Sequence, residues 1–460
     1  MKLFAIACAA LLSACSLAPK YERPALPVAN EYPYPAAATG TPAAQLGWQD
    51  FFADERLRPL VQRAIANNRD LRVAVLNVEL ARAQADVARA NLFPTINAAF
   101  NYTHAPVTPA NPANLYTAGL AISAWEVDLF GRLRSLSDAA FAQYIASDEG
   151  RKAAQMTLVA SVANTWLAIV ADDELLQITR ETLRTREESL RLTRLRFENG
   201  VASEIDSRTA ETLYETARAI LAQVTRQRAV DIDALALLLG EPVPANVRTP
   251  ESTLAVRFAD VPAGVPSEVL TARPDVRQAE QQLMAANANI GAARAAFLPH
   301  ITLTTEAGSA STALSGLFKA GSWGWTFAPS AAMAIFDAGR NSANLQSANV
   351  SRDIAVAQYE KSIQSAFRDV ADALAGRANF GDQVDVQQRA VEADKVRLRL
   401  AQLRYDNGVA SYLDLLDAQR SLFADQQVLV QARLAQLQNQ VQLYKALGGG
   451  AMGFDGIGLL

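Results

Sequence analysis

The chain has 460 residues, of which 50% are hydrophobic and 20% charged, and its formal net charge at pH 7 is −4. Because the charge is nearly balanced and only two histidines and two cysteines are present, we predict no nucleic-acid partner, no His/Cys metal site and no histidine-based catalytic site. No run of about 18 apolar residues follows the N-terminus, which argues against a helical membrane protein.

The chain opens with a short apolar run that ends in a cysteine. Lys2 is followed by apolar residues 3–12, which have the length of a signal-peptide core and are too short to span a bilayer. Leu12-Ser13-Ala14-Cys15 resembles the bacterial lipobox, in which a peptidase cuts before a cysteine that carries lipid. We predict a signal peptide over 1–14 and a diacylglycerol and N-acyl lipid on Cys15, with no other cofactor. The alternative is an ordinary signal peptide and an incidental cysteine.

Residues 15–47 are rich in Pro, Ala and Tyr, a composition that favours an extended arm between the lipid and the body of the protein. Ser16, in place of an aspartate, resembles the bacterial pattern for sorting to the outer membrane.

A repeat covers most of the chain. Residues 195–203 recur as 403–411 at an offset of 208, and Asp70-Leu71-Arg72 recurs as Asp275-Val276-Arg277 at an offset of 205. Two such matches at nearly constant offset indicate a tandem duplication of about 200 residues.

Each repeat is predicted to contain a helix, two strands and two long helices. Repeat 1 spans 48–240: an equatorial segment, a helix, strands at about 94–104 and 116–129, and helices over 131–197 and 204–240. An equatorial linker follows over 241–272. Repeat 2 spans 273–448, with a helix, strands at about 299–308 and 322–336, helices over 340–405 and 411–447, and a tail over 449–460.

Seven-residue spacing runs through the long helices. Leu176, Leu183, Leu190 and Phe197 mark it in repeat 1, and neither 131–197 nor 340–405 contains proline. This pattern predicts coiled-coil packing of helices that each reach roughly 100 Å. The acidic run 172–174 within the first helix is interpreted as a solvated face, because consecutive helical residues point in different directions. A coiled-coil rod without channel activity is the alternative at this point.

The strands favour a membrane protein over a rod. Ile96, Ala98, Phe100 and Tyr102 alternate with small or polar residues, as expected for strands of a transmembrane β-barrel. Four strands cannot close a barrel, so the barrel must be shared between chains. Two chains would give eight strands, and three would give twelve and room for a channel. The predicted fold class is mainly α with a small transmembrane β part.

Several motifs together resemble one family. They are the lipobox, residues 125–132 (WEVDLFGR), residues 336–340 (FDAGR), both Asn-Gly-Val-Ala-Ser turns and residues 412–422 (YLDLLDAQRSL). The chain is similar to the TolC-type outer-membrane factors, and more narrowly to the efflux lipoproteins of the OprM/CusC/NodT kind.

The resemblance implies a homotrimer with a twelve-stranded barrel in the outer membrane and a twelve-helix periplasmic tunnel. An equatorial belt would come from about 48–66, 241–272 and the tail. Such trimers serve as passive exit ducts for inner-membrane pumps of the resistance-nodulation-division (RND) type, joined through a periplasmic adaptor protein. The duct is not an enzyme, since the pump drives export.

The resemblance also places a gate on the last long helix. Leu413, Asp417 and Arg420 fall on the positions of the family's constriction and ionic lock, and their spacing puts them on one helical face. Asp414 and its repeat partner Asp206 are further candidates. The alternative is an ordinary solvated Asp417–Arg420 pair.

Two turns join the long helices. Asn199-Gly200 and Asn407-Gly408 break the helices where a left-handed residue is needed. In the family these tips meet the adaptor, so docking would involve Val201, Ala202 and Ser203 in one turn and Val409, Ala410 and Ser411 in the other. The alternative is a simple helical hairpin.

The predicted function is therefore an outer-membrane exit duct for small molecules such as drugs or metal ions. Two alternatives stay open: a TolC-type duct for protein secretion, and a lipid-anchored coiled-coil protein without a channel.

Overall fold

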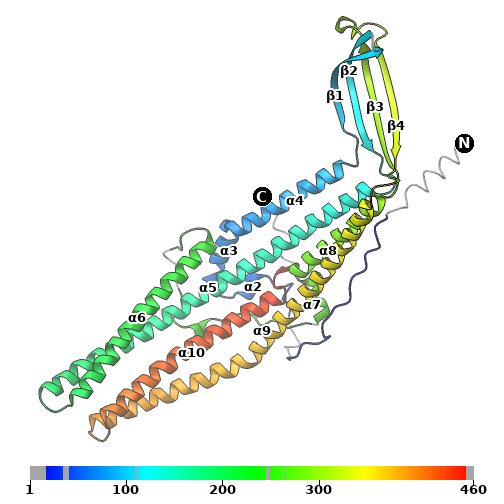
Figure 1. Ribbon diagram of the computed structural model, residues 1–460. Helices are drawn as coiled ribbons and strands as arrows, with labels where there is room; N and C mark the ends of the chain where they lie inside the picture. Colours follow the sequence, from blue (N-terminus) through cyan, green and yellow to red (C-terminus); the bar gives the residue numbers. More distant parts are fainter. Residues whose placement is uncertain (1–16, 35–40, 109–110, 245–248, 265, 452–460) are drawn as a thin grey trace. The chain divides into compact units, whose positions relative to one another are not determined.

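The computed structural model describes residues 17–34, 41–108, 111–244, 249–264 and 266–451 (Figure 1). The predicted signal peptide, Cys15 and most of the predicted tail lie outside these residues. The chain divides into two compact units, which are described separately. Unit 1 comprises residues up to 25, 76–149 and 277–361, and unit 2 comprises 26–75, 150–276 and 362 onward.

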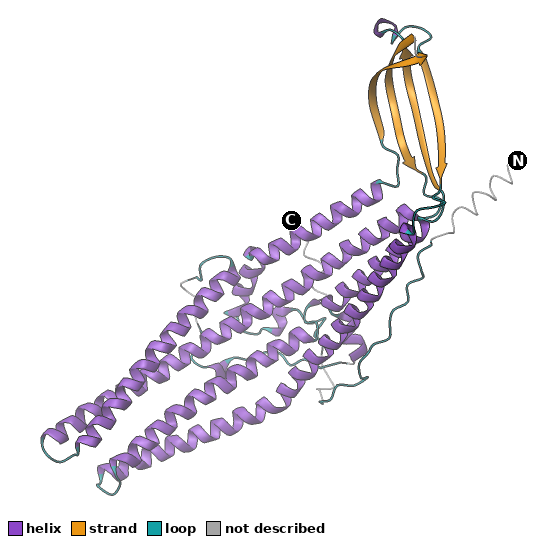
Figure 2. Ribbon diagram, in the orientation of Figure 1, coloured by secondary structure: helices purple, strands orange, loops and turns teal. Residues whose placement is uncertain are grey.

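The structure is mainly helical, with one four-stranded sheet (Figure 2). The long helices are α5 (Arg132–Glu198), α6 (Glu204–Leu239), α9 (Arg340–Asp406) and α10 (Tyr412–Ala446). Shorter helices are α2 (Trp48–Phe51), α3 (Leu57–Asn67), α4 (Arg69–Ala90), α7 (Pro266–Ala272) and α8 (Pro274–Ala295), with 3-10 turns η1 (Thr253–Ala255) and η2 (Leu314–Gly316). The strands are β1 (Ile96–Thr108), β2 (Asn111–Glu126), β3 (His300–Ser311) and β4 (Trp323–Ala332). The predicted fold class is confirmed.

The sheet in unit 1 is antiparallel in the order β1-β2-β3-β4, as Figure 1 shows. The two repeats meet where β2 pairs with β3. Gly119 lies opposite Gly308 in this pairing, and a Cβ on Gly119 would stand 2.4 Å from the backbone oxygen of Ala307. Glycine at both positions therefore lets the two strands approach.

The β1–β2 hairpin is longer than predicted. The sequence placed the strand ends at about 104 and 116, whereas pairing continues to Thr108 and Asn111. The described pairing of β2 with β3 begins only at Tyr116. Prolines 106 and 112 therefore lie beyond the three-stranded part, where a missing N–H interrupts fewer ladder bonds. Strands β2 and β4 end at Glu126 and Ala332, short of the predicted 129 and 336.

Large apolar side chains on the sheet are exposed in the single chain. Trp323 and Trp325 on β4 are 69% and 68% exposed, and Phe100 on β1 is 60% exposed. In the described residues, β1 and β4 each pair on one side only. The sheet thus presents apolar surface and two free edges.

The core of unit 2 is aromatic. Phe51 of α2 stacks on Tyr444 of α10 with ring centroids 4.0 Å apart, and Phe52 and Phe258 complete the cluster. The hydroxyl of Tyr444 donates to the carbonyl of Leu46 at 2.7 Å. The segment before α3 and the equatorial linker are thereby packed on the last long helix.

The acidic run of α5 is not the solvated face that the sequence suggested. Asp173 accepts a hydrogen bond from Thr249, and Glu174 accepts bonds from Ser252 and from the backbone and side chain of Thr253. These carboxylates hold the equatorial linker, a contact between segments about 80 residues apart that helical geometry alone does not reveal.

By length and composition, one helix among the described residues, α5, is able to cross a membrane. Its most apolar 18-residue window is 61% buried within the protein, a value typical of a core helix.

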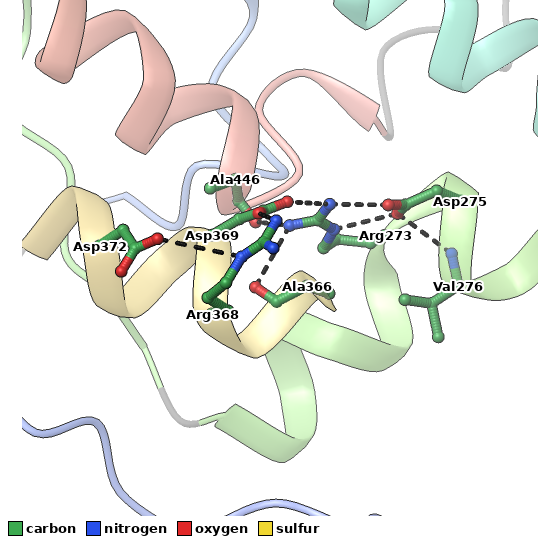
Figure 3. A network of polar contacts seen from close by, with 8 residues as sticks. All are labelled: Arg273, Asp275, Val276, Ala366, Arg368, Asp369, Asp372 and Ala446. Carbon is green, nitrogen blue, oxygen red and sulfur yellow. Dashed lines mark hydrogen bonds and ion pairs between the residues drawn. The ribbon is translucent and has the colours of Figure 1, made fainter. Parts of the chain in front are cut away.

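A buried arginine ties three helices of unit 2 together (Figure 3). Arg273, between α7 and α8, donates to Asp275 at 2.6 Å, to Asp369 of α9 at 3.4 Å and to the carbonyl of Ala446 at the end of α10 at 2.9 Å. Burial alone would lower the pKa of Arg273, but the hydrogen bonds to Asp275 and Asp369 outweigh burial and raise it. The guanidinium is therefore charged and neutralises the carbonyl end of α10.

Arg273→Leu should lower the free energy of unfolding by about 2 to 3 kcal/mol, because Asp369 and the Ala446 carbonyl lose a buried partner. Denaturant unfolding of the detergent-solubilised protein measures the loss. Arg368→Ala is the matched control, since exposed Arg368 also pairs with Asp369, and it should cause no measurable change. Equal losses in the two variants would contradict the role given to Arg273.

Asp172 provides a pH test. Burial raises the pKa of Asp172 to about 7, and the hydrogen bond with Asp231 and the charge of Asp231 act in the same direction. Between about pH 4 and pH 7 the unfolded chain has lost this proton while the folded protein keeps it, so stability falls as pH rises. Asp172→Asn should therefore stabilise the protein at pH 8 by up to about 3 kcal/mol and change little at pH 4. A difference independent of pH would contradict this assignment.

Candidate functional site

The two helical hairpins of unit 2 end in nearly identical turns. Gly200 and Gly408 adopt φ values of 71° and 70°, a left-handed backbone that L-residues rarely adopt. The preceding asparagines close each helix, because the side chain of Asn199 donates to the carbonyl of Leu195 at 2.6 Å and that of Asn407 to Leu403 at 2.7 Å. The Asn-Gly pair thus ends one helix and reverses the chain.

Each turn is followed by a capping box. The hydroxyl of Ser203 accepts from the backbone of Asp206 at 3.1 Å, and the Asp206 carboxylate accepts from the backbone N–H of Ser203 at 3.2 Å. Ser411 and Asp414 repeat this arrangement. Asp206 and Asp414, predicted as secondary gate residues, therefore serve as helix caps in the chain.

Apolar side chains project from both turns. Val201 and Val409 are 66% and 68% exposed, and the repeat partners Ile205 and Leu413 are 77% and 69% exposed. Ala202 and Ala410 are half-buried, whereas Ser203 and Ser411 are exposed. An exposed apolar group at each tip is suited to contact with another protein surface.

An ion-pair cluster lies near the second turn. Asp417 accepts a hydrogen bond from Arg420 at 3.0 Å and a second from Arg397 of α9. These two guanidinium groups hold the pKa of Asp417 below its usual range. The structure therefore brings Asp417 and Arg420 together, as the sequence predicted.

Arg397 is a member of this cluster that sequence reasoning missed. Its second amine donates to Ser421 at 3.2 Å, so it links α9 to α10 at two points. The available signal was the antiparallel register around Gly408, which puts residue 397 opposite 417. In repeat 1 the corresponding residues are Ser189, Thr209 and Thr212, which carry no charge.

A groove of about 810 Å³, lined mostly by polar and charged residues, separates the two hairpins near their turns. Ser189 of α5 and Tyr412 of α10 share a hydrogen bond of 2.6 Å across it, and Arg196 donates to the hydroxyl of Tyr405 at 2.5 Å. Charged residues line the α5 side: Arg184, Glu187, Glu188 and Arg191.

Within the stretches that the structure describes, no group of three or more His, Cys, Asp or Glu side chains is arranged to hold a metal ion. The predicted lipid site, Cys15, lies outside those stretches.

Comparisons with known proteins decide the family. The family model described as "Outer membrane efflux protein" matches residues 60–241 and 265–449, one segment for each repeat. The chain belongs to the outer membrane efflux protein family. Among curated relatives, the probable efflux pump outer membrane protein TtgC of Pseudomonas putida is 46% identical. The alignment covers 96% of this chain and 93% of TtgC. The outer membrane protein OprJ of Pseudomonas aeruginosa is 42% identical, with 97% of this chain and 95% of OprJ covered.

Solved structures agree. The MtrE outer membrane channel of Neisseria gonorrhoeae, in its open state, superimposes with a TM-score of 0.89 at 41% identity, covering 95% of this chain and 99% of MtrE. The chain is thus an outer-membrane channel component of an efflux system in a Gram-negative bacterium, and it extends into the periplasm.

Replacing Asp417 and Arg420 with alanine should raise single-channel conductance in planar bilayers, because the link between α9 and α10 near the turn is removed. The pair Glu392→Ala/Lys395→Ala is the control, since it removes an exposed ion pair elsewhere on α9. The cluster should be lost only under acidic conditions, because a carboxylate with a lowered pKa loses its partners only as pH falls through that pKa. Unchanged conductance in the Asp417/Arg420 variant would contradict the prediction that this ion pair holds the channel closed.

Proposed function

We propose that this chain forms a passive homotrimeric exit duct, anchored by lipid on Cys15 and joined to an RND-type inner-membrane pump through a periplasmic adaptor. The observation that carries the proposal is a pair of exposed apolar stripes in unit 1. The stripes lie on α4 and α9. The corresponding helices of the other repeat, α8 and α5, pack against each other inside the chain. By analogy, we infer that the α4 stripe is covered by an α9 stripe.

The internal contact joins α5 and α8. Ala139 and Ala142 of α5 form a buried cluster with Ala285 of α8, and Ala146 on the same stripe of α5 is fully buried. The ion pair Arg277–Glu149, at 3.0 Å, continues the same antiparallel alignment.

The repeat partners are larger and exposed. Ala142 and Ala146 correspond to Val350 and Ile354 of α9, which are 50% and 54% exposed. Ala285 corresponds to Leu80 of α4, which is 57% exposed. Leu76 and Val87 extend the α4 stripe with the spacing of a coiled-coil seam.

Because repeat 1 uses α5 and repeat 2 uses α8 for the internal contact, α4 and α9 are left for neighbouring copies. The α4 stripe of one copy then receives the α9 stripe of the next, a head-to-tail contact that closes into a ring. The same arrangement lets β4 of one copy pair with β1 of the next. Three copies give a twelve-stranded barrel, wide enough for a channel, whereas eight strands fill their interior with side chains.

The groove and exposed valines near the turns support adaptor docking at this end of the hairpins. Val201-Ala202-Ser203 and Val409-Ala410-Ser411 would contact the adaptor, and Leu413, Asp417 and Arg420 would form the gate. Relatives from Pseudomonas putida that are 46% identical are named for efflux of toluene, solvents and antibiotics. These names support small organic molecules as the exported class, in preference to secreted proteins.

Leu80→Glu and Val350→Glu should each abolish the trimer, because each puts a charge into an apolar seam. Native electrophoresis and light scattering in detergent measure the oligomer, and planar bilayers measure conductance. Leu80→Glu combined with Val350→Lys should restore both readouts, since the new charges are opposite. A trimer that survives both glutamates would contradict the proposed seam, and a trimer without conductance would favour the structural alternative.

A further inference from the structure

The N-terminal arm, residues 17–23 of unit 1, is attached to helix α8 at several points. Within unit 1, Asn287 of α8 donates its side-chain amide to the carbonyl of Pro19 at 2.7 Å. Two turns further, Arg294 donates to the carbonyl of Leu17 at 3.1 Å. Both bonds go to backbone atoms, so they fix the path of the arm whatever its side chains.

A buried carboxylate forms the strongest attachment. Glu280 is only 7% exposed in its side chain, and it accepts bonds from Arg23 at 2.6 and 2.9 Å and from the hydroxyl of Tyr21 at 2.9 Å. Burial and the hydrogen bond to Glu280 raise the pKa of Tyr21, so its hydroxyl keeps the proton that it donates. Departure of the arm would remove these three bonds from the Glu280 carboxylate.

A glycine inside α8 makes room for the arm. A Cβ on Gly291 would stand 2.8 Å from both the Cβ and the backbone nitrogen of Ala18. It would also stand 2.6 Å from the hydroxyl oxygen of buried Ser135 in α5. Glycine is a poor residue for a helix interior, and here it leaves room for the backbone of the arm as well as for Ser135.

The duplication supplies an internal comparison. At the offset of 205, Glu280, Asn287 and Gly291 correspond to Val75, Arg82 and Asp86 of α4. Only Arg294 keeps its identity, as Arg89. The two helices share an ancestor and a length, yet α8 alone carries the buried acid, the amide and the glycine. Glu280 and Asn287 make their hydrogen bonds to the arm, so the arm contact accounts for these two differences, whereas Gly291 also serves the packing of α8 on α5.

We propose that the face of α8 formed by Glu280, Asn287, Gly291 and Arg294 is a dedicated docking site for residues 17–23, which makes the arm a fixed tether and not a flexible linker. Leu17 lies two positions after Cys15, and two residues of chain span at most about 7 Å. Docking therefore holds Leu17, the first described residue of the arm, at Arg294, which lies six residues before strand β3 begins at His300. This purpose rests on the proposed lipid anchor; the docking itself does not.

Limited digestion with the lysine-specific protease Lys-C tests the proposal in detergent, on the full mature chain. Lys20 is the sole lysine between residues 17 and 34, and it lies in the middle of the docked segment. A protease needs several residues around the bond to leave the surface, so docking should protect the Lys20–Tyr21 bond. Arg23→Ala and Gly291→Ala should each speed cleavage there by about tenfold or more.

Asn289→Leu is the matched control, because Asn289 is an exposed residue of α8 outside the docking face. Its cleavage rate should equal that of the unchanged protein. Arg23→Ala leaves α8 intact, so the test stands even if Gly291→Ala folds poorly. Equal cleavage rates in all four proteins would overturn the proposal, as would protection that persists in Arg23→Ala and Gly291→Ala alike.

The same digestion separates this proposal from the proposed function. The released N-terminal fragment ends at Lys20, and its mass reports whether Cys15 carries lipid. Native electrophoresis of the same samples reports the oligomer. A fast-cleaving Gly291→Ala variant that remains oligomeric would support docking independently of the channel.

Discussion

The constraint on which the structure depends is the pair of free edges on its four-stranded sheet. In a bilayer, an unpaired backbone N–H or C=O has no water to bond, and each costs several kcal/mol. A chain with strands β1 to β4 in one open sheet is therefore incomplete in the outer membrane, where this family functions. The proposed trimer would cover the exposed tryptophans of β4 and the exposed stripes of α4 and α9.

The duplication explains how one chain supplies both sides of such contacts. The two repeats have the same order of elements, but their surfaces differ between positions buried inside the chain and positions exposed on it. Alanines lie where α5 and α8 meet inside the chain, and Leu80, Val350 and Ile354 lie at the corresponding places on the outside. Charges diverged in the same way: Asp417 with Arg397 and Arg420 occurs in repeat 2, where repeat 1 has serine and threonine.

Much of the fold was predictable because its signals are local and periodic. The long helices show through seven-residue spacing and the lack of proline, and the turns show through Asn-Gly followed by Ser-x-x-Asp. The strand ends were less predictable, because proline is tolerated in β2 where β3 no longer pairs with it. The capping role of Asp414 and Asp206 was not predicted, since a capping box and an exposed acid look alike in sequence; their place in a gate stays a prediction.

The sequence by itself determined the duplication, the helical and strand classes, the turns and the membership of the efflux family, since repeats, periodicity and motifs need no third dimension. Tertiary structure alone decided which distant residues meet. Arg397 reaches Asp417 across a hairpin, Arg273 reaches the end of α10, and Glu280 receives the arm from more than 250 positions away. Such contacts depend on how helices pack, and a charged side chain in a sequence gives no sign of which distant partner will neutralise it.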